Sequence, residues 1–146
     1  MSVRRAILIL FTLLPSLVLF FAACNTHPSI SEQIGAQLRS GASEIDMRQF
    51  GGSDWDHVFV FGPYSGKQEI CTAIGITEND CSRAGIRNLD EGESLLILMQ
   101  ARTLAAAGRL PRSTANFDDA CLAKNIPRSK ALFIVNRTSN VYLMCR

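Results

Sequence analysis

The chain has few of the residue patterns on which catalysis, metal binding or nucleic-acid binding usually depends. Only 2 of its 146 residues are histidines, and its cysteines form no Cys-x-x-Cys pair. The sequence contains neither a Gly-x-Ser-x-Gly nucleophile elbow nor a Walker-type glycine loop. No segment carries a run of like charge, so the electrostatic footprint of a nucleic-acid-binding protein is absent. We therefore expect no metal ion, no cofactor and no nucleic acid among its ligands.

What the chain does have is an export signal at its N-terminus. Met1–Arg5 is basic, Ala6–Phe20 is mostly apolar, and the small residues within Phe21–Cys24 precede a polar stretch. These three parts are typical of a secretory signal. A helix that spans a membrane needs about 20 apolar residues, and Pro15 would cost such a helix a backbone hydrogen bond. Plain secretion and an uncleaved membrane anchor remain open as alternatives to the lipoprotein interpretation that follows.

Phe21-Ala22-Ala23-Cys24 resembles the lipobox of bacterial lipoproteins, in which the cysteine receives a diacylglyceryl thioether and becomes the mature N-terminus. Phe21 stands where the family pattern prefers Leu, Val or Ile. The resemblance implies a signal peptide over residues 1–23, lipidation of Cys24 and a lipidated tether over residues 24–29. Because two or more acyl chains anchor a protein stably, we expect the chain in the cell envelope, held on its membrane. No Asp follows Cys24, which in a Gram-negative cell implies the outer membrane, facing the periplasm.

Residues 30–146 are enough for a single globular domain and too few for two. The whole chain carries 15 basic and 13 acidic residues, and the two numbers become equal once Arg4 and Arg5 leave with the signal peptide. The mature protein is therefore formally neutral.

Four cysteines remain besides Cys24, and an even number in an exported chain predicts disulfides. Four cysteines allow three pairings, and the sequence alone does not choose between them. We favour Cys71–Cys81, which closes a short loop, together with Cys121–Cys145, which ties the C-terminal strand to an upstream helix. A metal site formed by these cysteines is the competing interpretation.

The hydrophobic pattern predicts helices and strands in no regular alternation. Helices are expected at Ser29–Arg39, at Lys67–Ile74 with Ser65 as N-cap, and in a short turn that starts at Asn116 or Asp118. Strands are expected at 44–50, 55–61, 94–100, 102–109, 131–135 and 140–144, with a loop over 76–92. Helix remains the alternative for 102–109, because three consecutive alanines favour it. Together these elements predict an α+β fold in which two or three short helices pack on a mostly antiparallel sheet, stabilised by disulfides.

Val58–Phe61 is apolar at every position, and successive residues of a strand face opposite sides of the sheet. We therefore expect a central strand covered on both faces, by helices on one and by loops or the tether on the other. Trp55 is expected to be buried where this strand begins.

Ser53–Tyr64 resembles a recurrent element of small uncharacterised bacterial lipoproteins, in which Trp-Asp is followed by a hydrophobic strand and Gly-Pro-Tyr. The resemblance implies no activity. Asp54, Asp56 and His57 lie within this element and form a potential acid/base cluster. The competing interpretation is that Asp56 fixes the start of the strand by local hydrogen bonds.

The function we expect is a non-catalytic binding or structural domain, held at the membrane by lipidated Cys24, with an envelope protein as its partner. An inhibitor-like or immunity-like role fits by analogy. The candidate partner surface comprises Asp56, His57, Tyr64, Arg109 and Arg112. Two further basic residues, Arg128 and Lys130, either converge with the arginines on an anionic surface or are solvated loop charges. The alternative function is a small periplasmic hydrolase that uses Asp56 and His57, which a pocket containing His57 and a distant carboxylate would favour.

Overall fold

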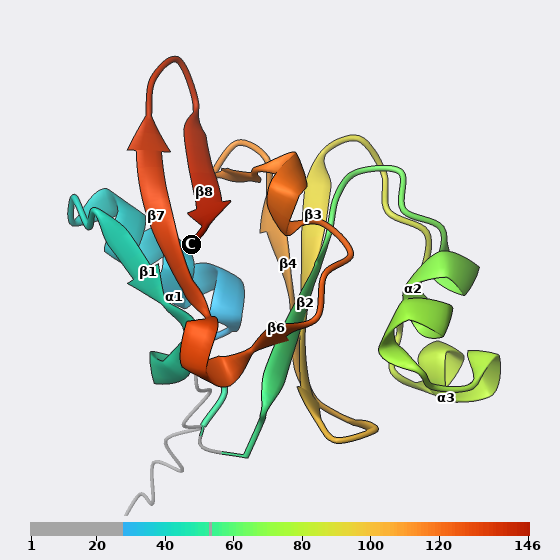
Figure 1. Cartoon of the computed structure of the whole chain (residues 1–146). Helices are drawn as coiled ribbons and strands as arrows, with labels where there is room; N and C mark the ends of the chain where they lie inside the picture. Colours follow the sequence, from blue (N-terminus) through green and yellow to red (C-terminus); the bar gives the residue numbers. More distant parts are fainter. Residues whose placement is uncertain (1–27, 53) are drawn as a thin grey trace, which may run out of the picture.

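The computed structural model describes residues 28–52 and 54–146, which fold into two four-stranded sheets and three α-helices (Figure 1). The signal peptide, Cys24 and most of the tether expected from the sequence lie outside these residues. Within the described part, no helix has the length and apolarity that crossing a membrane requires.

The first sheet has the strand order β1-β7-β8-β5 and the second has the order β4-β3-β2-β6. All strand pairs are antiparallel except β5 with β8. The helices are α1 (Ile30–Arg39), α2 (Lys67–Ile74) and α3 (Glu78–Arg83), and three short 3-10 turns are η1 (Met47–Gln49), η2 (Asp119–Cys121) and η3 (Arg128–Lys130). The strands are β1 (Glu44–Asp46), β2 (His57–Phe61), β3 (Glu93–Gln100), β4 (Thr103–Pro111), β5 (Asn116–Phe117), β6 (Ile126–Pro127), β7 (Leu132–Arg137) and β8 (Val141–Cys145).

The expected α+β class with disulfides is confirmed, but the sheet is divided into two. The C-terminal hairpin of β7 and β8 turns its own apolar residues, including Phe133 and Leu143, toward the second sheet. Such a face must be buried against another layer, so the hairpin forms the centre of a separate sheet. The single sheet inferred from the strand count could not show this, because strand pairing is not encoded in local periodicity.

Strand β2 lies inside the second sheet, between β3 and β6, as the sequence predicts. Val58 and Val60 face an inner core shared with α1 and the first sheet, whereas Phe59 and Phe61 face an outer core with α2 and α3. Both faces are therefore covered. The cover of the inner face differs from the expectation, since a helix and a second sheet occupy it rather than loops or the tether (Figure 1).

Three local expectations need correction. The segment 76–92 is not only a loop, because Thr77 caps the short helix α3, whose single buried residue is Cys81. Helix α2 begins as expected, but its N-cap is Gly66 and not Ser65. The strand expected over 44–50 ends early, at β1, and continues as η1. One buried side chain in α3 leaves no hydrophobic periodicity for the sequence to display.

Two open alternatives are decided by the structure. Residues 102–109 belong to strand β4, which forms an antiparallel hairpin with β3. The short turn that carries Cys121 starts at Asp118, whose carboxylate accepts a hydrogen bond from the amide of Ala120 at 2.8 Å.

Both favoured disulfides are confirmed. Cys71–Cys81 joins α2 to α3 with a Cα–Cα distance of 6.0 Å, and Cys121–Cys145 joins η2 to β8 at 5.5 Å. The two helices of the outer layer have only eight and six residues, and helices this short are marginal in water. The first disulfide therefore holds the outer layer together, and the second fixes η2 against the first sheet.

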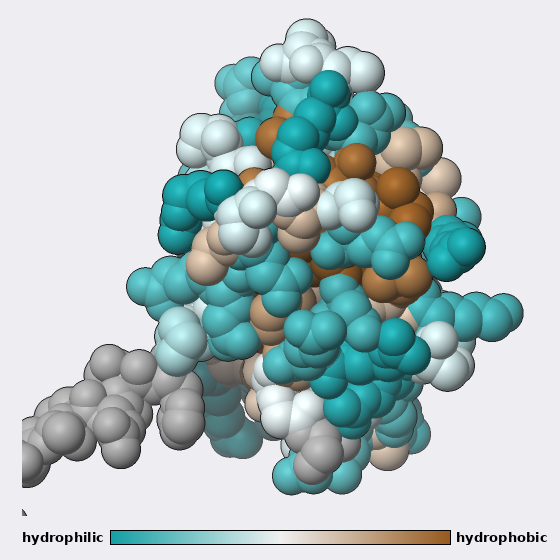
Figure 2. Space-filling view, turned by 90° about the vertical axis from the view of Figure 1, so that its left-hand side faces the viewer, coloured by the Kyte–Doolittle hydropathy of each residue, from teal (hydrophilic) through white to brown (hydrophobic). Residues whose placement is uncertain are grey.

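The outer face of the first sheet carries apolar side chains that belong to neither core. Leu132, Ile134 and Met144 share this face, and Met144 is 37% exposed. Figure 2 shows apolar atoms gathered among polar ones on the side of the molecule that β1, β7 and α1 form. A single exposed methionine on such a face is ordinary for a soluble surface, and it serves below as a control position.

Candidate functional site

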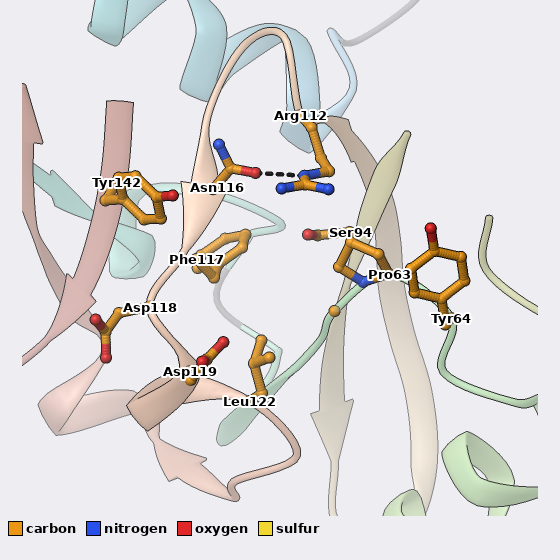
Figure 3. Close-up of a pocket in the computed structure, with 11 residues that line it drawn as sticks. Pro63, Tyr64, Ser94, Arg112, Asn116, Phe117, Asp118, Asp119, Leu122 and Tyr142 are labelled. Atoms are coloured by element: carbon orange, nitrogen blue, oxygen red, sulfur yellow. Dashed lines mark hydrogen bonds between the residues drawn. The ribbon is translucent and has the colours of Figure 1, made fainter. Parts of the chain in front are cut away.

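A hollow of about 380 Å³ opens where the loop after β2 approaches strand β5 (Figure 3). Its walls come from Gly62–Tyr64, from the start of β3, and from the segment 116–119 with Tyr142 beside it. The volume lies within the range of small-ligand sites, about 300–1,000 Å³. We call this hollow the β5 cleft.

Strand β5 presents an unpaired edge to this cleft. It is the last strand of its sheet, and the amide of Asp118 donates to the carbonyl of Leu143 on β8 at 3.0 Å. Backbone groups of neighbouring residues in a strand point in opposite directions, so the N–H and C=O of Phe117 point away from β8. Neither group bonds to any residue in the described part of the chain. The cleft is lined by residues from both faces of β5, which places it along this open edge.

Ser94 contributes a hydroxyl to the wall of the cleft. The residue as a whole is 2% exposed, but no buried side-chain oxygen or nitrogen of the described residues lacks a partner, so this hydroxyl, which bonds to no described residue, reaches the cleft surface. Figure 3 shows this oxygen directed into the cleft between Phe117 and Pro63. A hydroxyl that lines a cleft and bonds to no protein group keeps its donor and its acceptors for water or a ligand. Ser94 is therefore a group that a ligand in the cleft could satisfy.

Arg112 lies at one end of the cleft and is held by neutral acceptors. Its Nε donates to the Asn116 side-chain oxygen at 2.6 Å, and one terminal nitrogen donates to the carbonyl of Glu91 at 3.3 Å. Unlike Arg109, which pairs with Glu93 at 2.7 Å, it forms no ion pair with a described residue. Because its acceptors are neutral, the positive charge of this guanidinium is not compensated by them, and its other N–H groups can donate to an anionic ligand. A carboxylate matches the planar guanidinium best in geometry.

Carboxylates lie at the opposite end of the cleft. Asp118 is engaged, because one oxygen caps η2. Asp119 is exposed, and its side chain makes no hydrogen bond within the described segments. The cleft therefore carries opposite charges at its two ends, with a cation before β5 and a free carboxylate after it (Figure 3).

Tyr64 forms the rim of the cleft in a conformation that tyrosine rarely adopts. Gly62–Ser65 is a tight turn closed by a 3.3 Å hydrogen bond, and Tyr64 occupies its third position with φ of 67°. The side chain is 70% exposed. Partial desolvation and the neighbouring Glu91 carboxylate raise the pKa of Tyr64. The phenol is thus a neutral donor at physiological pH.

The positive φ of Tyr64 implies that replacing this residue with glycine stabilises the protein. This conformation costs a non-glycine residue roughly 1–2 kcal/mol, whereas glycine adopts it freely at an entropic cost of about 0.5–1 kcal/mol. We expect Tyr64→Gly to raise the free energy of unfolding by about 0.5–1 kcal/mol, measured by urea denaturation. Tyr64→Ala is the control, since it removes the phenol and keeps the strain. Equal stabilities of the two variants would contradict the argument.

Asp56 and His57 lie at the other end of β2, away from the cleft, and they contact each other. The second oxygen of Asp56 accepts from the amide of Ala101 at 2.7 Å, and its backbone bonds to Met99 and Arg128. The His57 ring packs on Phe59 with a centroid distance of 5.5 Å. These contacts connect the start of β2 to its neighbours, so they favour the interpretation that Asp56 has a local structural role.

Trp55 and Arg128 form the remaining contacts at the start of β2. The indole is 2% exposed and donates to the carbonyl of Phe50 at 2.9 Å, in agreement with the expected burial. Arg128 lies over the ring at 4.9 Å and donates to the carbonyl of Arg48 at 3.1 Å. Its guanidinium closes the core here. The basic residues do not converge, because Arg109 is paired on β4, whereas Arg128 and Lys130 lie in η3, directly after β6 at the opposite edge of the second sheet.

Of the five candidate surface residues, the structure places only Tyr64 and Arg112 at the cleft, whereas Asp56 and His57 contact each other at the other end of β2. Ser94, Asp119 and the backbone of Phe117 were not predicted from the sequence. Ser94 had one detectable signal, since it is the polar first residue of an otherwise apolar run. The unpaired groups of Phe117 had none, because they depend on which strand β5 pairs with.

Within residues 28–52 and 54–146, no cluster of three or more potential metal ligands occurs. No protein-family model, no curated protein and no solved structure matches this chain.

Proposed function

We propose that this chain is a lipid-anchored envelope protein whose single domain binds a partner, without catalysis, in the β5 cleft. The observation that carries the proposal is the combination of an open strand edge with a hydroxyl on the opposite wall that bonds to no described residue and faces the cleft. Strand edges and converging polar groups are recurrent means of holding a peptide or protein segment. The groups in the cleft are donors, acceptors and one cation, and no described side chain bonds to the Ser94 hydroxyl as a general base would.

The expected anchor supports the same role. Residues 24–29 span at most about 20 Å when fully extended, and α1 begins directly after them at Ile30. A lipid on Cys24 would therefore hold the domain close to the membrane surface. Partners in the same envelope layer would meet it at a high effective concentration.

Photocrosslinking in intact cells tests both parts of the proposal. We place p-benzoylphenylalanine at position 64, on the rim of the cleft, and fractionate the cells after irradiation. The expected result is a membrane-bound adduct that Arg112→Gln reduces severalfold. Combining the probe with Cys24→Ser should release the protein from membranes, or leave it unprocessed, and should reduce the adduct as well.

Thr138, in the exposed turn between β7 and β8, is the control position for the same probe. Adducts of equal yield from positions 64 and 138 would contradict binding in the cleft. A Cys24→Ser protein that remains on membranes with the mass of the mature wild type would contradict the lipid anchor.

A further inference from the structure

We propose that the β5 cleft binds the C-terminal end of an extended peptide, laid antiparallel to β5, with its terminal carboxylate on Arg112. This inference rests on the proposed binding function and specifies its ligand. Three features of the cleft carry it: the strand edge, the order of charges along it, and the apolar floor.

The strand edge selects an extended backbone. Phe117 offers one N–H and one C=O in the same direction, and both are unpaired in the described structure. In an antiparallel pair, two facing residues exchange both of their backbone hydrogen bonds. A single residue of a bound peptide can therefore satisfy Phe117 completely. The edge of β5 is only two residues long, so the peptide needs few residues to occupy it.

The order of charges gives the peptide its direction. Arg112 precedes β5 and is bound to Asn116, the first residue of the strand, whereas Asp119 follows the strand. A carboxylate belongs beside Arg112 and a cationic or donor group beside Asp119. A peptide with its C-terminus at the start of β5 runs opposite to that strand. Charge and strand geometry thus agree on the antiparallel direction.

The floor of the cleft selects an apolar side chain. Phe117 and Leu122 line it, with Pro63 on the facing wall (Figure 3). Gly62 keeps this floor in place, because a Cβ there would lie 2.8 Å from a methyl group of Leu122. The Ser94 hydroxyl, directed into the same space, can donate to the peptide carboxylate or to its last carbonyl. These groups favour a peptide over an acidic sugar, which would use Arg112 but would not need a strand edge.

The test uses the full-length lipidated protein in detergent micelles and the tripeptide Ala-Ala-Leu. We expect the free acid to bind and to shift the amide resonance of Phe117. The C-terminal amide of the same peptide should bind about tenfold more weakly or worse, because a charge-assisted hydrogen bond is lost. N-methylation of the peptide amide that pairs with Phe117, tested at each amide in turn, should weaken binding at one position only.

Protein variants provide matched controls. Arg112→Gln should weaken binding of the free acid about tenfold and leave the affinity for the amide unchanged. Arg102→Gln, on the exposed β3–β4 turn, is the control and should change neither affinity. Ser94→Ala should weaken binding severalfold without lowering the stability of the protein, since its hydroxyl faces the cleft and bonds to no described residue. Ser113→Ala, at an exposed position, is the control for that variant.

Several outcomes would overturn the proposal. These are equal affinities of acid and amide, no binding of either peptide, and binding of an oligogalacturonate in their place. If any of them occurs while the crosslink from position 64 persists in cells, the peptide assignment fails and the binding function stands. If the crosslink is lost as well, both fail.

Discussion

Phe61→Ala is expected to remove a large part of the stability of the domain. The side chain is fully buried in the outer core, where it stacks on Phe59 with a centroid distance of 6.2 Å. Truncation of a buried phenylalanine costs about 3–5 kcal/mol, and a domain of this size is stabilised by only about 5–15 kcal/mol. Thermal unfolding should therefore shift downward by roughly 10 °C or more, or cease to be cooperative. The same loss is expected for Phe59→Ala.

Met144→Ala is the matched control for these variants. Met144 is also an apolar strand residue, but it lies on the outer face of the first sheet and is 37% exposed. Its truncation should change the free energy of unfolding by about 0.5 kcal/mol or less. If Phe61→Ala melts within a degree or two of the wild type, the outer core contributes little and α2 and α3 are loosely held.

An element of this fold could be predicted from the sequence when its own residues determine it, and could not when contacts with distant segments determine it. The strand His57–Phe61 was predictable because its β-branched and aromatic residues themselves favour a strand, and because both of its faces are apolar. Disulfide formation was predictable from the even number of cysteines after the expected export signal, but the pairing was only favoured, because the sequence alone leaves three pairings open. Residues 102–109 stayed ambiguous because alanine is compatible with a helix, and only the ladder with β3 decides for the strand. Helix α3 buries one side chain, so it produces no pattern.

The candidate site was harder to predict because its groups are defined by what they fail to contact. Arg112 resembles any other arginine in the sequence, and only the structure shows that its acceptors are neutral. Phe117 reads as a core residue, which its side chain is, while its backbone forms the open edge. The sequence indicated Asp56 and His57 as a potential acid and base. In the structure the two side chains contact each other, and Asp56 also accepts a hydrogen bond from the amide of Ala101.

Removal of the Cys121–Cys145 disulfide should affect stability and binding together. The bond closes a loop with a sequence separation of 24, and its loss costs roughly 3 kcal/mol of loop-closure entropy. It also fixes η2, which follows β5 directly, against β8. In the variant Cys121→Ala/Cys145→Ala we expect both a lower free energy of unfolding and a severalfold weaker affinity for Ala-Ala-Leu, because the β5 edge loses its support.

Cys71→Ala/Cys81→Ala separates these two effects. Its disulfide closes a loop with a sequence separation of 10 and joins α2 to α3, on the outer face of the second sheet. The stability lost is similar, about 3 kcal/mol, but no wall of the cleft depends on it. Measured at a temperature where both variants remain folded, peptide affinity should fall only when Cys121 and Cys145 are replaced. Equal losses of affinity would mean that binding responds to global stability, and that the second disulfide has no special part in forming the cleft.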